Sequence, residues 1–154
     1  MRNFLLSLSG ICLLSGAAAW VTFLVVGPPD RSVACDPDDL PEYHVCLSTV
    51  REWESADVLW VDARPRKDWE KDGIKGSVLV NDQEDWNDLE LGFLTVMVEE
   101  PKPKVVVYCN QSGCGSSKYV ANELRKRHSA DFGFEVFVLE GGSKALAAEQ
   151  GSRD

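Results

Sequence analysis

The sequence is poor in the residues that bind metal ions. It contains two histidines and five cysteines, and neither a His-plus-carboxylate spacing nor a paired-cysteine spacing typical of a zinc site occurs among them. Cys109 and Cys114 form an isolated C-x4-C, which is a weak signal without a second ligand pair. We therefore expect no metal and no cofactor. Five cysteines are too few for a disulfide scaffold, but they suffice for one bridge and one reactive thiol.

Positive charge is also scarce. The 154 residues carry 16 lysines and arginines against 25 aspartates and glutamates, a formal net charge of -9. A surface this acidic argues against nucleic acid and against anionic membrane surfaces as partners. The length is that of a chain with one globular domain.

Charged residues are absent between Asn3 and Val26. This apolar stretch has the roughly 20 residues that a helix needs to cross a bilayer, so we expect residues 1–29 to form an N-terminal transmembrane anchor. Arg2 precedes it and acidic residues follow, which by the positive-inside rule places the domain outside the cytoplasm, in the periplasm if the source is bacterial. The alternative is a signal sequence cleaved at Ala17-Ala18-Ala19, but the apolar run continues past that cut.

Two cysteines flank the segment that follows the apolar stretch. Residues 30–42 are polar and acidic and are predicted to be a linker, with the folded domain over 43–150. Cys35 lies in this linker and Cys46 at the start of the domain. Outside the cytoplasm these thiols can pair and tie the linker to the domain; two unpaired thiols are the alternative.

Short β-branched runs alternate with segments of helical spacing from residue 43 onward. The predicted strands are 43–47, 58–61, 78–80, 105–108 and 134–139. The predicted helices are 48–55, 66–72, 84–99, 118–128 and 143–150. This alternation predicts an α/β fold with a mostly parallel central sheet covered by helices on both faces. In such sheets ligands bind beyond the carboxyl ends of the strands.

Cys109 directly follows the most strongly β-branched of these runs. A loop of small and polar residues comes next, and then a helix whose positive dipole end faces the thiol. We expect this environment to favour the thiolate and to bind anions. The predicted substrate-binding residues of the loop are Asn110, Gln111, Ser112, Gly113, Cys114, Gly115 and Ser116. Ser116 or Ser117 is expected to cap the helix. The plainer interpretation of Cys109 is a small core residue.

Three motifs together resemble a known family. Val61-Asp62-Ala63-Arg64 ends one strand, Gly73-Ile74-Lys75-Gly76-Ser77 forms a turn, and Val107-Tyr108-Cys109 is followed by Ser116-Ser117 and later by Gly141-Gly142. In this order and spacing, over roughly residues 44–142, they resemble a single-domain rhodanese, a sulfurtransferase. The resemblance implies a rhodanese-like fold and a cysteine, here Cys109, that carries a persulfide.

The same resemblance implies the partners. Thiosulfate, a polysulfide or another persulfide would donate sulfur to Cys109, and a thiol would accept it. Loop N–H groups, helped by Arg64, would hold the sulfur-containing anion. Related phosphatases and arsenate reductases have an arginine six residues after the cysteine. Gly115 stands at that position here, which excludes phosphatase chemistry.

Two other functions remain open. Cys114 is a possible resolving thiol that would form a disulfide with Cys109 in a dithiol redox cycle, or it only fills the loop interior. The loop from Asn110 to Ser117 carries no cation, and Lys118 is the first to follow. A non-catalytic rhodanese-like docking module on a membrane anchor is therefore the other alternative.

Overall fold

The computed structural model of this chain describes residues 35–53, 57–99, 104–110 and 115–151. All of them belong to one compact unit, Val33–Asp154. The predicted anchor over residues 1–29 lies outside the described residues, as does the first part of the predicted linker. Within the described ranges, no helix has both the length and the apolar character needed to span a membrane.

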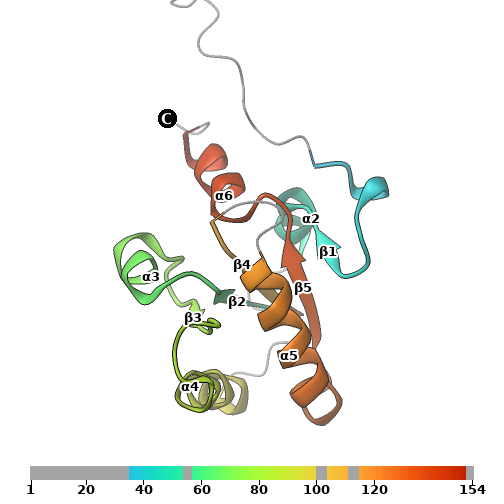
Figure 1. Ribbon diagram of the computed structural model, residues 1–154. Helices are drawn as coiled ribbons and strands as arrows, with labels where there is room; N and C mark the ends of the chain where they lie inside the picture. The colour runs from blue at the N-terminus through green and yellow to red at the C-terminus, as the bar shows by residue number, and fades with distance from the viewer. Residues whose placement is uncertain (1–34, 54–56, 100–103, 111–114, 152–154) are drawn as a thin grey trace, which may run out of the picture. The chain divides into compact units, whose positions relative to one another are not determined.

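A single five-stranded sheet forms the centre of this unit (Figure 1). The strands are β1 (His44–Val45), β2 (Val58–Asp62), β3 (Val78–Leu79), β4 (Lys104–Tyr108) and β5 (Glu135–Leu139). Their order in space is β1-β5-β4-β2-β3, and every neighbouring pair is parallel. The prediction of an α/β fold with a parallel central sheet is therefore confirmed. Both edge strands are two residues long, which limits edge-to-edge pairing with other chains.

Helices cover both faces of the sheet. They are the 3-10 turn η1 (Pro37–Asp39), α2 (Leu47–Glu52), α3 (Arg66–Asp72), α4 (Trp86–Glu99), α5 (Gly115–Phe132) and α6 (Gly142–Gly151). On one face, Phe93 of α4 and Leu124 of α5 join the larger core cluster. On the other face, Val50 of α2 and Leu146 of α6 pack into a second cluster.

The side chains of β4 alternate between these two clusters. Val105 and Val107 belong to the α4/α5 cluster, as does Cys109 just beyond the strand. Val106 and Tyr108 belong to the α2/α6 cluster. All five side chains are at most 2 % exposed, which explains the unbroken β-branched run because a strand buried on both faces has no polar side.

The cysteine helix is longer at both ends than its predicted range of 118–128. Helix α5 begins at Gly115. Ser116 and Ser117, expected as caps, are instead helical, and their hydroxyl groups donate to Asp82 and to the Cys109 sulfur. The helix continues to Phe132 and ends where Gly133 adopts a φ of 67° and donates its N–H to the Ser129 carbonyl. Glycine tolerates this left-handed conformation.

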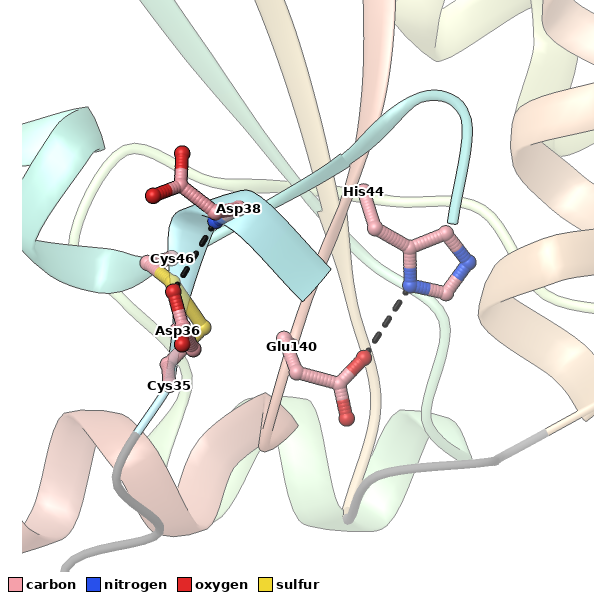
Figure 2. Close-up of a disulfide and its surroundings, with 6 residues drawn as sticks. All are labelled: Cys35, Asp36, Asp38, His44, Cys46 and Glu140. Atoms are coloured by element: carbon pink, nitrogen blue, oxygen red, sulfur yellow. Dashed lines mark hydrogen bonds and ion pairs between the residues drawn. A yellow bond between two sulfur atoms is a disulfide. The ribbon is translucent and has the colours of Figure 1, made fainter. Parts of the chain in front are cut away.

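A disulfide joins Cys35 to Cys46 at the start of the domain, with an S–S distance of 2.01 Å (Figure 2). Cys46 is 1 % exposed and stands at the N-terminus of α2. Beside it, His44 Nδ1 of β1 lies 3.1 Å from the Glu140 carboxylate. The bridge that the sequence left open is therefore present, and it fixes the segment around η1 to α2.

Candidate functional site

Cys109 lies at the carboxyl edge of the sheet, one residue beyond β4, and is 2 % exposed. The N-terminal turn of α6 holds the backbone around it. The Ser143 N–H donates to the Cys109 carbonyl at 2.6 Å, and Ser143 Oγ donates to the Asn110 carbonyl at 3.3 Å. The Gly141-Gly142 pair adopts positive φ angles of 79° and 56° directly before this contact, a conformation that favours glycine.

The Cys109 sulfur has two recorded partners. Ser117 Oγ, in the first turn of α5 and buried, donates a hydrogen bond to Cys109 Sγ at 3.4 Å. The sulfur is also engaged in a disulfide. Ser117 therefore provides a donor that would stabilise negative charge on the Cys109 sulfur.

The structure describes part of the predicted binding loop. Gln111, Ser112, Gly113 and Cys114 lie outside the described residues. Asn110 is exposed at one end of that gap, and Gly115 begins α5 at the other. The loop residues before and after the gap thus lie at the same sheet edge as Cys109.

Asp82 is a functional candidate that the sequence analysis missed. It follows β3, and its carboxylate accepts the Ser116 hydroxyl at 3.0 and 3.1 Å. Ser116 lies in the first turn of α5, so this negative charge stands at the positive end of that helix. The contact spans 34 residues, and nothing in the sequence around Asp82 indicates it.

Arg64 is largely occupied by carboxylates. Its Nε donates to both oxygens of Asp62 at 3.0 Å, its Nη2 to Asp62 Oδ2 at 2.8 Å and its Nη1 to Asp72 at 2.6 Å. Arg64 is 5 % exposed and Asp62 is fully buried. Burial by itself lowers the pKa of Arg64, but the hydrogen bonds with Asp62 and Asp72 outweigh it and raise that pKa. Arg64 therefore cross-links β2 to α3. Any contact of its guanidinium with a ligand would have to be made while it is hydrogen-bonded to the Asp62 and Asp72 carboxylates.

Tyr108 belongs to the same buried network. Its hydroxyl accepts the Ile74 N–H at 3.1 Å, and the Arg64 guanidinium lies 5.5 Å from its ring centroid. Burial and the hydrogen bond with Asp62 raise the pKa of Tyr108 to about 12. The phenol is therefore neutral at physiological pH.

A cavity of about 390 Å³ opens on this face of the sheet. Arg64, Tyr108 and Trp60 line its sheet side, and Ser143 and Leu146 of α6 line another. Cys109 is not part of the lining, although its neighbours Tyr108 and Ser143 are. Within the described ranges, no cluster of three or more His, Cys, Asp or Glu side chains could hold a metal ion.

Comparisons with known proteins agree with this geometry. The family described as Rhodanese-like domain matches residues 49–149. The As–Sb reductase from Leishmania major is similar in structure with a TM-score of 0.56 and 19 % sequence identity, over 71 % of this chain and 79 % of that one. A Bacillus halodurans protein gives a TM-score of 0.47 and 18 % identity, over 70 % and 73 % of the two chains. No curated protein matches significantly.

Proposed function

This chain belongs to the rhodanese-like domain family, and from that premise we propose that it is a sulfurtransferase that works through a persulfide on Cys109. The observation that carries the proposal is the position of Cys109. The thiol lies at the carboxyl edge of a parallel sheet, beside the first turn of α5, with Ser117 Oγ donating to its sulfur. Such sheet edges are where α/β proteins bind ligands.

The proposed reaction has two half-reactions. The Cys109 thiolate attacks the outer sulfur of a donor such as thiosulfate; a Cys109 S–S bond forms, the S–S bond of thiosulfate breaks, and sulfite leaves with the electron pair. An acceptor thiolate then attacks the outer sulfur of the persulfide, and Cys109 leaves as thiolate. The Ser117 hydroxyl stabilises Cys109 when it is negatively charged, before the first step and after the second.

The disulfide at Cys109 supports a second candidate, a dithiol redox enzyme. In that cycle a resolving thiolate, Cys114 in our proposal, attacks Cys109 Sγ of the persulfide and releases hydrosulfide as the disulfide forms. The similar protein from Leishmania major is an As–Sb reductase, but at 19 % identity the likeness extends only to the fold. Gly115 also supplies no side chain to clamp an oxyanion.

Intact-mass analysis of the reduced domain would separate these functions. The protein is exposed to thiosulfate or polysulfide beside Cys109→Ser and Cys114→Ser variants. Sulfur transfer predicts a gain of about 32 Da that requires Cys109 alone. A loss of about 2 Da that requires both cysteines would establish the dithiol cycle instead. No mass change with any donor would contradict catalysis by Cys109 and favour a docking module.

We also propose that residues 1–29 anchor the domain outside the cytoplasm. The Cys35–Cys46 disulfide supports this location because such bonds persist in oxidising compartments. Fractionation of cells that express the full chain, beside a chain that starts at Asp30, tests the anchor. Recovery of both proteins in the soluble fraction would contradict it.

A further inference from the structure

Ser143 of α6 donates two hydrogen bonds to the backbone at the reactive cysteine. Its N–H donates to the Cys109 carbonyl at 2.6 Å, and its hydroxyl donates to the Asn110 carbonyl at 3.3 Å. The first N–H groups of any helix lack a partner within the helix, so the first bond does not depend on the side chain. The second bond is exposed and exists only because residue 143 carries a hydroxyl group. The side chain is therefore the part of Ser143 that calls for a functional explanation.

The chain before Ser143 fixes its position relative to the sheet. Helix α6 follows β5 directly at the carboxyl edge (Figure 1). At the end of β5, the Glu140 N–H donates to the Val45 carbonyl of β1 at 2.9 Å, and the Glu140 carboxylate lies 3.1 Å from His44 Nδ1 (Figure 2). The glycine pair with positive φ angles then turns the chain into α6. The two donors of Ser143 are thus held by the sheet and not by the loop after the reactive cysteine.

The two bonds set the direction of the Asn110 N–H. The described peptide bonds are trans, and in a planar trans peptide group the C=O and the N–H point in opposite directions. The Cys109 carbonyl points to α6, so the N–H of the same peptide group, which belongs to Asn110, points away from α6. No described residue accepts a hydrogen bond from this N–H. The Asn110 N–H is therefore a donor that a ligand at the carboxyl edge can use.

The contact with α6 also makes this donor stronger. The Ser143 N–H belongs to the first turn of α6, where the helix dipole has its positive end. A hydrogen bond to the carbonyl of a peptide group polarises that group, and its N–H becomes a better donor. Helix α6 therefore acts on the site through the peptide group between Cys109 and Asn110, whereas α5 acts through the Ser117 hydroxyl, which donates to Cys109 Sγ.

We propose that Ser143 is a positioning residue, which directs the Asn110 N–H at the outer sulfur of a Cys109 persulfide. The inference rests on the proposed sulfurtransferase function, because that outer sulfur is present only after a donor has transferred it. When the persulfide loses its proton to water, the negative charge resides on the outer sulfur. A fixed N–H stabilises this anion. Ser117 and Asn110 thus serve different atoms, Ser117 the cysteine sulfur and Asn110 the sulfur bonded to it.

The test follows the ionisation of the loaded persulfide. The full chain carries Cys12→Ser and Cys114→Ser, so that Cys109 is the one free thiol while the Cys35–Cys46 disulfide is closed. Cys109 is loaded with polysulfide, excess donor is removed, and the persulfide is alkylated with iodoacetamide over a series of pH values. Intact mass distinguishes the alkylated persulfide from the alkylated thiol by about 32 Da.

Two substitutions at Ser143 separate its hydroxyl group from the rest of the residue. Ser143→Ala removes the donor to the Asn110 carbonyl, and Ser143→Thr keeps it. Thr95→Ala is the matched control, because the Thr95 hydroxyl donates to the Leu91 carbonyl at 2.8 Å at an exposed position of α4. It removes the same kind of bond far along the chain from the cysteine.

Ser143→Ala is expected to raise the pH midpoint of persulfide alkylation by about 0.3 to 0.6, or two- to fourfold in the ionisation constant, because the anion loses part of its stabilisation. Ser143→Thr and Thr95→Ala should keep the wild-type midpoint. Alkylation of Cys109 before loading should proceed at the wild-type rate in all three variants, since no outer sulfur is present then.

Other results would overturn the role of Ser143. An unchanged midpoint in Ser143→Ala, or an equal shift in Thr95→Ala, would show that its hydroxyl does not act on the persulfide. Slower alkylation of the unloaded thiol in Ser143→Ala would show that Ser143 maintains the backbone in general and directs no donor at the outer sulfur. Failure of the chain with wild-type Ser143 to gain sulfur in the loading step would instead overturn the sulfurtransferase, and the positioning role with it.

Discussion

At the scale of single residues, one buried hydroxyl group lies against the sulfur of Cys109. Ser117 is 3 % exposed and donates to the cysteine sulfur. A donor aimed at a sulfur that becomes negative contributes most when the charge is present. Ser117 therefore links helix α5 to the reactivity of the thiol.

Replacing Ser117 with alanine should slow the reaction of reduced Cys109 with polysulfide about three- to tenfold, because the thiolate loses a hydrogen-bond donor. Alkylation by iodoacetamide should slow in parallel, which a purely conformational effect on substrate binding would not produce. Stopped-flow or mass-spectrometric kinetics would measure both rates. Ser129→Ala is the matched control because Ser129 donates to the Arg125 carbonyl near the other end of the same helix; equal effects of the two variants would refute the role of Ser117.

Asp82 should control which donors Cys109 accepts. Asp82→Asn keeps an acceptor for the Ser116 hydroxyl but removes a negative charge beside the entrance to α5. We expect persulfide formation from the thiosulfate dianion to accelerate about two- to fivefold, since the repulsion is partly screened. The rate with uncharged diallyl trisulfide should stay unchanged.

The control for Asp82 is Asp131→Asn, near the C-terminal end of α5. About 15 residues of helix, or roughly 22 Å, separate it from Ser116. Asp131→Asn should alter neither rate. If both variants accelerated the reaction with thiosulfate, the cause would be the net charge of the protein and not the position of Asp82.

At the scale of elements, two polar side chains hold helices in place: the half-buried Glu90 and the buried Arg64. Glu90 of α4 accepts Trp86 Nε1 at 3.0 Å and lies 2.8 Å from His128 Nε2 of α5. Burial opposes ionisation of Glu90, but the hydrogen bonds with Trp86 and His128 outweigh it and lower its pKa. The two helices on this face are thus joined through a carboxylate whose ionised form these hydrogen bonds favour.

Glu90→Gln should lower the free energy of unfolding by about 1 kcal/mol at pH 7. Because the pKa of Glu90 is lower in the folded state, its contribution is present above the unfolded pKa near 4.5 and is lost as the pH falls through the folded pKa. The difference between wild type and variant in urea unfolding should therefore shrink between pH 5 and pH 3. Glu135→Gln changes an exposed residue at the start of β5 and provides the comparison; a constant difference across this pH range would contradict the argument.

Arg64 should matter more for stability than for binding. Arg64→Leu leaves the fully buried Asp62 carboxylate without its partner and should cost about 3 to 5 kcal/mol in urea unfolding. Arg66→Leu breaks an exposed pair with Glu84 and should cost at most about 1 kcal/mol. An Arg64 variant that unfolds like wild type but fails to bind donor would restore the substrate-binding role predicted from the sequence.

At the scale of the whole molecule, the Cys35–Cys46 bridge closes a loop with a sequence separation of 11. Removing such a cross-link is expected to cost about 2 to 4 kcal/mol. Cys35→Ser in a Cys109→Ser background should show this loss in urea unfolding, relative to Cys109→Ser alone. The shared background removes the disulfide at Cys109 from both proteins. Equal midpoints would mean that the bridge contributes nothing to the stability of the domain.

Local patterns were sufficient to predict the sheet. The valines of β4 and the apolar run of β2 are buried on both faces. Such a run can be recognised in the sequence without knowledge of the strands that pair with it. The position of Cys109 just beyond β4 was predicted for the same reason, because it ends one of these runs. The contacts of Asp82 with Ser116 and of Glu90 with His128 were not predicted, because they join residues 34 and 38 positions apart. The start of α5 was misplaced because serine favours caps in general, whereas here each hydroxyl has a tertiary partner.

The position of β1 has a consequence for the order in which the protein is made. Its partner in the sheet is β5, with His44 opposite Val138, so the first strand to leave the ribosome pairs with the last. At about 5 to 20 residues per second, β1 waits on the order of 5 to 20 seconds for its neighbour. Cys35 and Cys46 are close in sequence and need no such wait, so an oxidising compartment can close that loop before the sheet is complete.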